Sequence, residues 1–103
     1  MTRHTPQHEV ELYREADSYV VVLELPGTAA EDVDVNWVDS HLSVAAEVTR
    51  DGRNRVVSRR LSVPKRIDPS GIAARFEEGV LEVTLPIVGE EPPDGVSIEV
   101  ESA

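Results

Sequence analysis

The residues that could carry a chemical step in this chain lack the arrangement that a catalytic centre requires. Asp39-Ser40-His41 contains the residue types of a hydrolase triad. In a triad these side chains converge on one proton pathway, which contiguous residues cannot do, because neighbouring side chains on a strand point to opposite faces. We therefore expect Asp39 and Ser40 to form a turn, and we expect no catalytic residue.

Two further groups could suggest a metal site or an acid–base pair. His4 and His8 have the spacing of ligands on one helix face, but Pro6 lies between them and no third ligand is near. The pairs Glu77-Glu78 and Glu90-Glu91 would lie in a turn and a linker, without the burial that tunes a general acid. Cysteine and a glycine-rich phosphate loop are both absent. We expect no enzyme activity, no metal and no cofactor.

Length and charge narrow the remaining classes of function. The 103 residues fit one domain with one modest core. A net charge of −10 argues against a nucleic-acid partner and against an anionic membrane partner. The N-terminus is polar, and no apolar stretch approaches the roughly 20 residues of a membrane span, so we expect neither a secretion signal nor an anchor. The expected location is the cytoplasm.

Basic residues gather in the middle of this acidic chain. Eight of the ten lie between residues 50 and 75, where only two acidic residues occur. No aromatic residue lies between the arginines to stack on bases, so the cluster does not indicate nucleic-acid binding. We predict instead that it pairs with acidic surface of the same or a neighbouring subunit.

The elements that would position all these residues are strands. Apolar and polar residues alternate along most of the chain, and no window shows sustained helical periodicity. The expected strands occupy residues 10–15, 19–25, 31–38, 42–48, 57–63, 72–76 and 80–87. The dipeptide Asp51-Gly52 is a favoured two-residue hairpin loop. About seven or eight short strands at close spacing predict an antiparallel β-sandwich.

The segment from Ala74 to Pro86 has the most informative local pattern. Its apolar residues recur at every second position, and it reads as two strands joined by a glutamate-glycine turn. Gly79 can supply the positive φ that such a reversal requires. Val80 and Leu81 then open the second strand.

The composition changes after Pro86. Residues 88–95 contain too few apolar groups to pack, which predicts an extended, mobile linker. Ile98 and Val100 follow as two β-branched residues on one face of an extended segment. This island could be a frayed terminus, a last strand at residues 96–100 that closes its own sheet, or a tethered ligand for a groove elsewhere, which the proline-containing tether favours.

Four blocks of residues 9–100 together resemble the α-crystallin domain of small heat-shock proteins. These blocks are Leu25-Pro26-Gly27, Asp32–Val35 with Leu42–Val44, Arg59–Asp68, and Ala74–Pro86 with its Gly79-Val80-Leu81 turn. Ile98 and Val100 resemble the family's tail motif, which docks into a groove between two strands of a neighbouring subunit. The resemblance implies an all-β, antiparallel, immunoglobulin-like β-sandwich over residues 9–88, between a short flexible arm (1–8) and a flexible tail (89–103).

The resemblance also implies a function and a site. It implies an ATP-independent holdase of the stress response that binds partly unfolded client proteins and assembles as a homo-oligomer, either a dimer or a small assembly. The anchor would be Ile98 and Val100. The groove candidates, whose pattern equally fits ordinary sandwich core, are Val33, Val35, Trp37, Ile72, Ala74 and Phe76. The alternative function is a β-sandwich interaction module, such as a CS-like co-chaperone domain without independent holdase activity.

Two departures from the family pattern bear on assembly. Only eleven residues separate Glu47 from Arg59, where prokaryotic and plant members usually have a long loop that exchanges a strand between partners. Edge-to-edge pairing of residues 56–59, as in animal crystallins, is the alternative, with Val57 and Arg59 as interface candidates. The N-terminal arm is also short, which predicts small oligomers and weak holdase activity.

Overall fold

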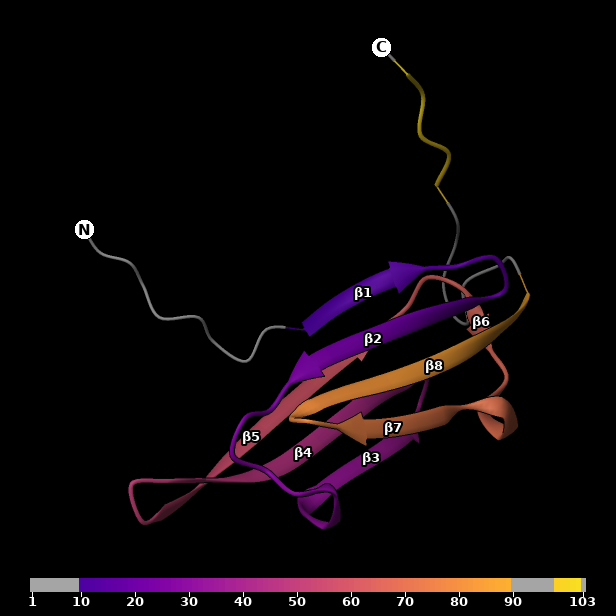
Figure 1. The fold of residues 1–103 in the computed structure, drawn as a ribbon. Helices are drawn as coiled ribbons and strands as arrows, with labels where there is room; N and C mark the ends of the chain where they lie inside the picture. Colours follow the sequence, from indigo (N-terminus) through magenta and orange to yellow (C-terminus); the bar gives the residue numbers. More distant parts are fainter. Residues whose placement is uncertain (1–9, 90–97, 103) are drawn as a thin grey trace.

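The computed structural model describes residues 10–89 and 98–102, and within these ranges the chain forms eight strands and no α-helix (Figure 1). The strands are β1 (Val10–Arg14), β2 (Ser18–Glu24), β3 (Val33–Val38), β4 (His41–Arg50), β5 (Arg53–Ser62), β6 (Arg66–Ile67), β7 (Ala73–Glu77) and β8 (Val80–Gly89). Two short 3-10 turns, η1 (Ala30–Asp32) and η2 (Pro69–Gly71), precede β3 and β7. The all-β prediction is confirmed.

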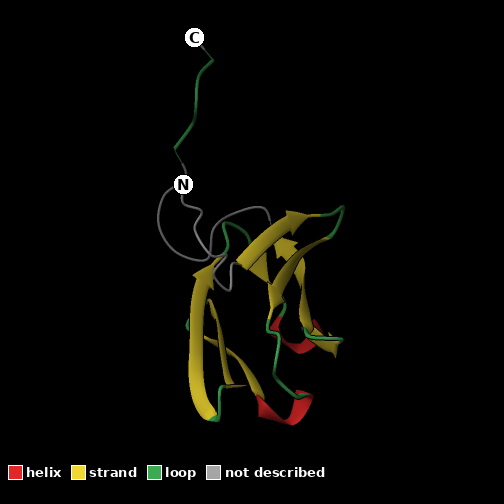
Figure 2. Cartoon of the chain, turned by 60° about the vertical axis from the view of Figure 1, so that its left-hand side comes forward, coloured by secondary structure: helices red, strands yellow, loops and turns green. Residues whose placement is uncertain are grey.

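The strands form two antiparallel sheets that face each other as separate layers (Figure 2). In the first sheet β2 lies between β1 and β8, and the other edge of β8 pairs with β7 and then with β6. The second sheet has the order β3-β4-β5. The predicted antiparallel sandwich is therefore present, and each sheet has two outer strands whose free edges bear on function.

Alternating side chains from both sheets fill the core. In β2 and β8 the inward residues lie opposite one another in register, as Tyr19 with Leu85 and Leu23 with Leu81. Opposite residues of an antiparallel pair share a face, so one register fixes the inner face of both strands. The buried cluster comprises Tyr19, Val21, Leu23, Leu25, Leu42, Val44, Ala46, Val48, Val57, Val63, Ile67, Leu81, Val83 and Leu85.

Three hairpins close through two-residue turns in which both residues have positive φ. This combination matches the twist of the flanking strands and defines the favoured hairpin turn. The turns and their φ angles are Asp39-Ser40 (51° and 65°), Asp51-Gly52 (52° and 74°) and Glu78-Gly79 (51° and 78°). The turn predictions at all three positions, including the positive φ of Gly79, are confirmed.

The Leu25-Pro26-Gly27 block continues the sheet contacts of β4 beyond the end of β3. The amide of Thr49 donates to the carbonyl of Gly27 at 3.2 Å, and the hydroxyl of Thr28 donates to the carbonyl of Glu47, also at 3.2 Å. Gly27 has φ +83°, and a Cβ there would lie 3.1 Å from the Thr49 carbonyl oxygen. Glycine is required at this point for both reasons.

The end of the last strand differs from the prediction. β8 continues through Pro86 to Gly89, so the expected linker does not begin at Val88. The extension is held by β6, which the sequence pattern did not indicate and whose Ile67 pairs with Ile87. Proline has no amide donor but keeps its carbonyl, and the carbonyl of Pro86 accepts from the Asp68 amide at 3.0 Å. Residues 90–95, the rest of the expected linker, lie outside the described ranges, as do residues 96 and 97.

Candidate functional site

The groove candidates lie along two outer strands, one from each sheet (Figure 1). β3 ends the second sheet, and β7 pairs only with β8. Within the described residues no further strand covers the outer edge of β3 or of β7. This side of the sandwich therefore consists of two open strand edges with apolar side chains between them.

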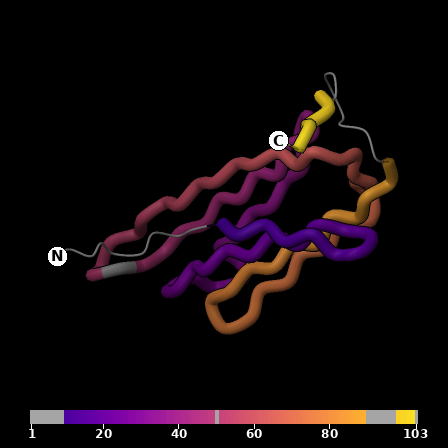
Figure 3. Tube along the Cα trace, turned by 90° about the horizontal axis from the view of Figure 1, so that it is seen from above, coloured from indigo at the N-terminus to yellow at the C-terminus, as the bar shows by residue number. Residues whose placement is uncertain are grey.

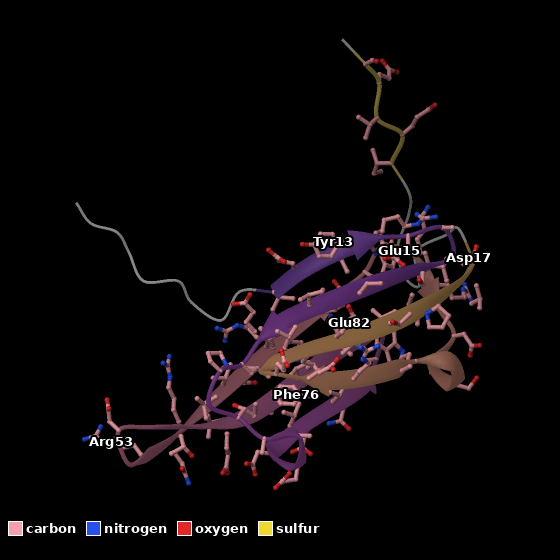
Figure 4. The ribbon with its side chains drawn as sticks, in the orientation of Figure 1. Tyr13, Glu15, Asp17, Arg53, Phe76 and Glu82 are labelled. Carbon is pink, nitrogen blue, oxygen red and sulfur yellow. The ribbon has the colours of Figure 1, made fainter. Side chains whose placement is uncertain are left out.

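The inward direction of these side chains follows from the registers. Val35 lies opposite the buried Val44 on β4, and Phe76 lies opposite the buried Leu81 on β8. Ala74 lies opposite Val83 and is itself exposed. The partly buried candidates that pack against the core cluster are Val33, Val35, Trp37, Ile72 and Phe76, of which Phe76 is labelled in Figure 4. They face the core, yet lack the complete cover of true core residues.

The loop before β7 determines the position of Ile72, the groove candidate that directly precedes this strand. The Asp68 carboxylate accepts from the Ser70 amide at 3.1 Å and from the Ser70 hydroxyl at 2.8 Å. This capping starts η2, which ends with the Ile72 amide directed to the Pro69 carbonyl at 3.4 Å. The Asp68-Pro69 part of the family-like block thus positions Ile72 just before β7.

The residues of the Gly79-Val80-Leu81 turn have other positions than the groove candidates. Gly79 occupies the turn, and Leu81, 2% exposed, is a core residue. Val80 points to the other face of β8 and is 36% exposed. The three residues therefore position β7 against β8 rather than line the groove.

Charged side chains surround the outer face of β7. Arg75 and Glu77 form an ion pair at 2.9 Å, and both are well exposed. The hydrogen bond to Glu77, the charge of Glu77 and then that of Glu82 raise the pKa of Arg75. On the β3 side Asp32 and Asp34 are exposed, as are Asn36 and Val38. The two edges of the proposed groove thus carry acidic side chains and one arginine.

The predicted anchor is exposed. Ile98 is 78% and Val100 is 89% exposed, and residues 98–102 have no regular secondary structure. A last strand that closes its own sheet is therefore wrong for residues 98–100, the described part of that expected strand. Two hydrophobic side chains one residue apart are left uncovered by the rest of the described chain.

The predicted subunit-interface residues lie on β5, which runs along the margin of the molecule (Figure 3). Val57 is 4% exposed and faces the core, so its side chain is not available at the surface. Arg59 is half-buried, and its guanidinium donates to the Ser58 carbonyl at 2.9 Å. The exposed apolar side chain of this strand is Val56, at 66%. The sequence pattern could have identified Val56, because a strand that buries Val57 must turn the neighbouring Val56 outward.

The residues considered for catalysis or metal binding form no site in the described ranges. Asp39 and Ser40 make the turn, and a ring nitrogen of His41 lies 2.8 Å from the Asp39 carbonyl oxygen rather than beside a nucleophile. Among the described residues no group of three or more histidines and carboxylates could hold a metal ion. No helix in that part is long and apolar enough to cross a membrane. His4, His8 and Glu90-Glu91 lie outside the described ranges.

Comparison with known protein sequences shows the family to which the chain belongs. The sequence model of the Hsp20/alpha crystallin family matches residues 11–101. Heat shock protein 16 of Schizosaccharomyces pombe is 31% identical over 93 residues, and the 18 kDa heat shock protein of Clostridium acetobutylicum is 30% identical over 91. The matches include 77% and 76% of this chain, but only 65% and 60% of the length of these relatives.

Comparison with solved structures gives the same fold. Heat shock protein 16.0 of S. pombe superposes with a TM-score of 0.75 at 27% identity, covering 97% of this chain and 87% of that one. The rat alpha crystallin domain superposes with a TM-score of 0.61, covering 99% of both chains. At 19% identity this second likeness concerns the fold alone.

Proposed function

Because the chain belongs to the Hsp20/alpha crystallin family, whose members are small heat-shock chaperones, we propose that it is an ATP-independent holdase that binds partly unfolded clients and prevents their aggregation. The observation that carries this proposal is that the predicted anchor and the predicted groove residues are both left without full cover. Ile98 and Val100 are uncovered, and the outer edges of β3 and β7 carry partly buried apolar side chains. The apolar side chains of the tail of one copy would cover the apolar side chains of the groove in another.

The strength of one such contact suits reversible assembly. Burying Ile98 and Val100 would contribute roughly 1.5 to 3 kcal/mol each, before the cost of ordering the tail. One tail therefore binds weakly and opens often. Several tails in one oligomer act together through effective concentration, so the assembly persists while each groove is transiently free.

A freed groove would expose apolar surface to a client. Trp37 and Phe76 are the largest side chains along it, and neither is fully covered by the chain's own core. Exposed apolar segments of an unfolding protein are the class of partner that such a surface takes up. The proposed partners are these clients and further copies of the chain in a small homo-oligomer in the cytoplasm.

The test is suppression of heat-induced aggregation of a client enzyme, without nucleotide and at near-stoichiometric ratio. The matched control replaces Glu99, which lies between the two anchor residues, with serine, and leaves both apolar side chains in place. We expect the unmodified chain and Glu99→Ser to suppress aggregation. Failure of the unmodified chain at both low and high salt would contradict the holdase proposal and favour a CS-like interaction module.

A further inference from the structure

The free edge of β5 has a defined set of outward backbone groups. Arg50 and Arg53 flank the two-residue turn, so their backbones hydrogen-bond to each other across the hairpin. Alternate residues from Arg53 onward therefore direct their amide and carbonyl groups to β4, and the intervening ones direct theirs to the free edge. The Arg59 guanidinium bonded to the Ser58 carbonyl fits this, because no described strand pairs with that carbonyl.

Arginines restrict how this edge can meet the same edge of a second copy. In a two-fold antiparallel pairing, opposite residues share a face, and like charges directly opposite are destabilising. Centring the axis on Val56 sets Arg53 opposite Arg59 of the second copy. Centring it on Val57 sets Arg55 opposite Arg59 of the second copy. Centring it on either of the last two arginines of the strand sets that arginine opposite itself.

Centring the axis on Ser58 avoids every arginine pair. Val57 then lies opposite Arg59 of the second copy on the inner face, and Val56 lies opposite Arg60 of the second copy on the outer face. The 66% exposed Val56 gains the aliphatic part of that arginine as cover.

A carboxylate lies in line with the same pair. Glu47 is the β4 partner of Val56, so the outer face runs Glu47, Val56, then Arg60 of the second copy. Strands are about 4.8 Å apart, which puts the two charged residues roughly 10 Å apart at Cα, within the joint reach of their side chains. In the described part of the chain neither Glu47 nor Arg60 has an ion-pair partner of its own.

We propose that two copies pair through β5 in the register that sets Ser58 opposite Ser58, with Glu47 of each copy joined to Arg60 of the other across Val56. The second copy is the occupant because the edge carries both halves of a self-complementary charge pattern. This inference rests on the homo-oligomer of the proposed function and adds one of its interfaces, with the register and the recognition residues.

Cross-linking of single-cysteine variants reports the register directly, since the chain has no cysteine of its own. Asn54, Val56, Ser58, Arg60 and Ser62 share one face of β5, and a cysteine meets its own copy only when it lies on the axis. Under mild oxidation of the full chain, we expect Ser58→Cys to form a covalent dimer on a denaturing gel. Ser62→Cys is the matched control, because its two copies would be about 27 Å apart.

Two outcomes of the cysteine series would overturn the proposal. Faster cross-linking of Val56→Cys or Arg60→Cys than of Ser58→Cys would show another register. Absence of cross-linking in every variant, while light scattering still shows a dimer, would place the interface elsewhere. Neither outcome affects the aggregation assay, so failure of the register and failure of the holdase function are separable.

A charge exchange tests the recognition residues independently. Glu47→Arg and Arg60→Glu should each raise the dimer dissociation constant roughly three- to tenfold, because each dimer contains two such pairs. The double variant should restore it. Asp17→Arg replaces an exposed acidic residue between β1 and β2, away from β5, and should leave the constant unchanged. Equal weakening by Asp17→Arg, or no recovery in the double variant, would contradict the pairing.

Discussion

The amide of Leu25 donates a 2.6 Å hydrogen bond to the carbonyl of Gly79, and this bond joins two family-like blocks that lie far apart in the sequence. Leu25 follows β2, and Gly79 lies in the turn between β7 and β8. Because β2 pairs with β8, the bond continues the ladder past Glu24 and Val80. The two turns therefore fix the end of the sheet from which β7 runs along the groove.

We expect three glycine variants to differ in a defined order. Gly79→Ala and Gly52→Ala should each lower the free energy of unfolding by roughly 1–2 kcal/mol, the cost of a left-handed residue with a Cβ. Gly27→Ala should cost more, because its Cβ would also lie 3.1 Å from the Thr49 carbonyl oxygen, whereas the Cβ at Gly52 meets nothing within 4 Å. Urea unfolding measures all three. Equal losses for Gly27→Ala and Gly52→Ala would remove the steric part of this account.

Ala74→Arg should block the groove without unfolding the protein. Ala74 and Ala73 are adjacent exposed residues of β7 on opposite faces, so Ala73→Arg is a matched control. We expect both to change stability by less than about 0.5 kcal/mol, as surface substitutions usually do. Only Ala74→Arg should lower the oligomer mass measured by light scattering. The same mass for both variants would separate Ala74 from the docking surface.

Truncation after Gly95 should lower the mass of the assembly, because it removes both anchor residues. The double variant Ile98→Ser/Val100→Ser should do the same, while Glu99→Ser should not. An unchanged mass after truncation would rule out the tail anchor.

Trp37 offers a local probe of the same contact, since it is the single tryptophan of the chain and lies on β3. A synthetic peptide of residues 96–102, added to the truncated chain, should shift its fluorescence emission to shorter wavelength as water leaves the groove. The control peptide carries serine in place of Ile98 and Val100. Equal shifts with both peptides would speak against apolar docking.

Core and edge leucines should differ strongly. Leu85 is fully buried, and Leu85→Ala should cost about 2–5 kcal/mol of unfolding free energy through lost burial and a cavity. Leu12 is 40% exposed on the outer strand β1, and Leu12→Ala should cost less than about 1 kcal/mol. Thermal or urea unfolding measures both. A comparable loss for Leu12→Ala would indicate that a second copy covers β1.

Salt should weaken subunit association if the arginine-rich β4–β5 hairpin pairs with acidic surface. Arg53 lies at its projecting tip (Figure 4), and Arg55 follows on the same strand. At about 1 M salt the screening length falls to about 3 Å, so exposed charge pairs lose most of their attraction. Sedimentation over a salt series measures this. Stronger association at high salt would instead point to apolar contacts.

Local patterns were enough to predict most strands and turns of this fold. Alternation in Tyr19–Leu25 and Leu42–Val48 identifies buried faces, and the Asp51-Gly52 and Glu78-Gly79 dipeptides identify turns, because these features depend on residues adjacent in the chain. Two features of the fold were not predicted, because they depend on residues that are distant in the chain or on too few residues. β6 is too short to show alternation, and the continuation of β8 past Pro86 depends on Asp68, which binds its carbonyl.

By itself the sequence determined which side chains face inward, as at Val35, Val44 and Phe76, since a period of two records the face of a strand. It left open whether such a residue is core or groove, because both have the same period. Only the tertiary structure decided that. It made β3 and β7 outer strands, whose inward side chains lack a neighbour on one side, whereas Val44 lies on β4 between β3 and β5 and is covered on both sides. Sheet order depends on pairings between distant segments, and no local pattern records it.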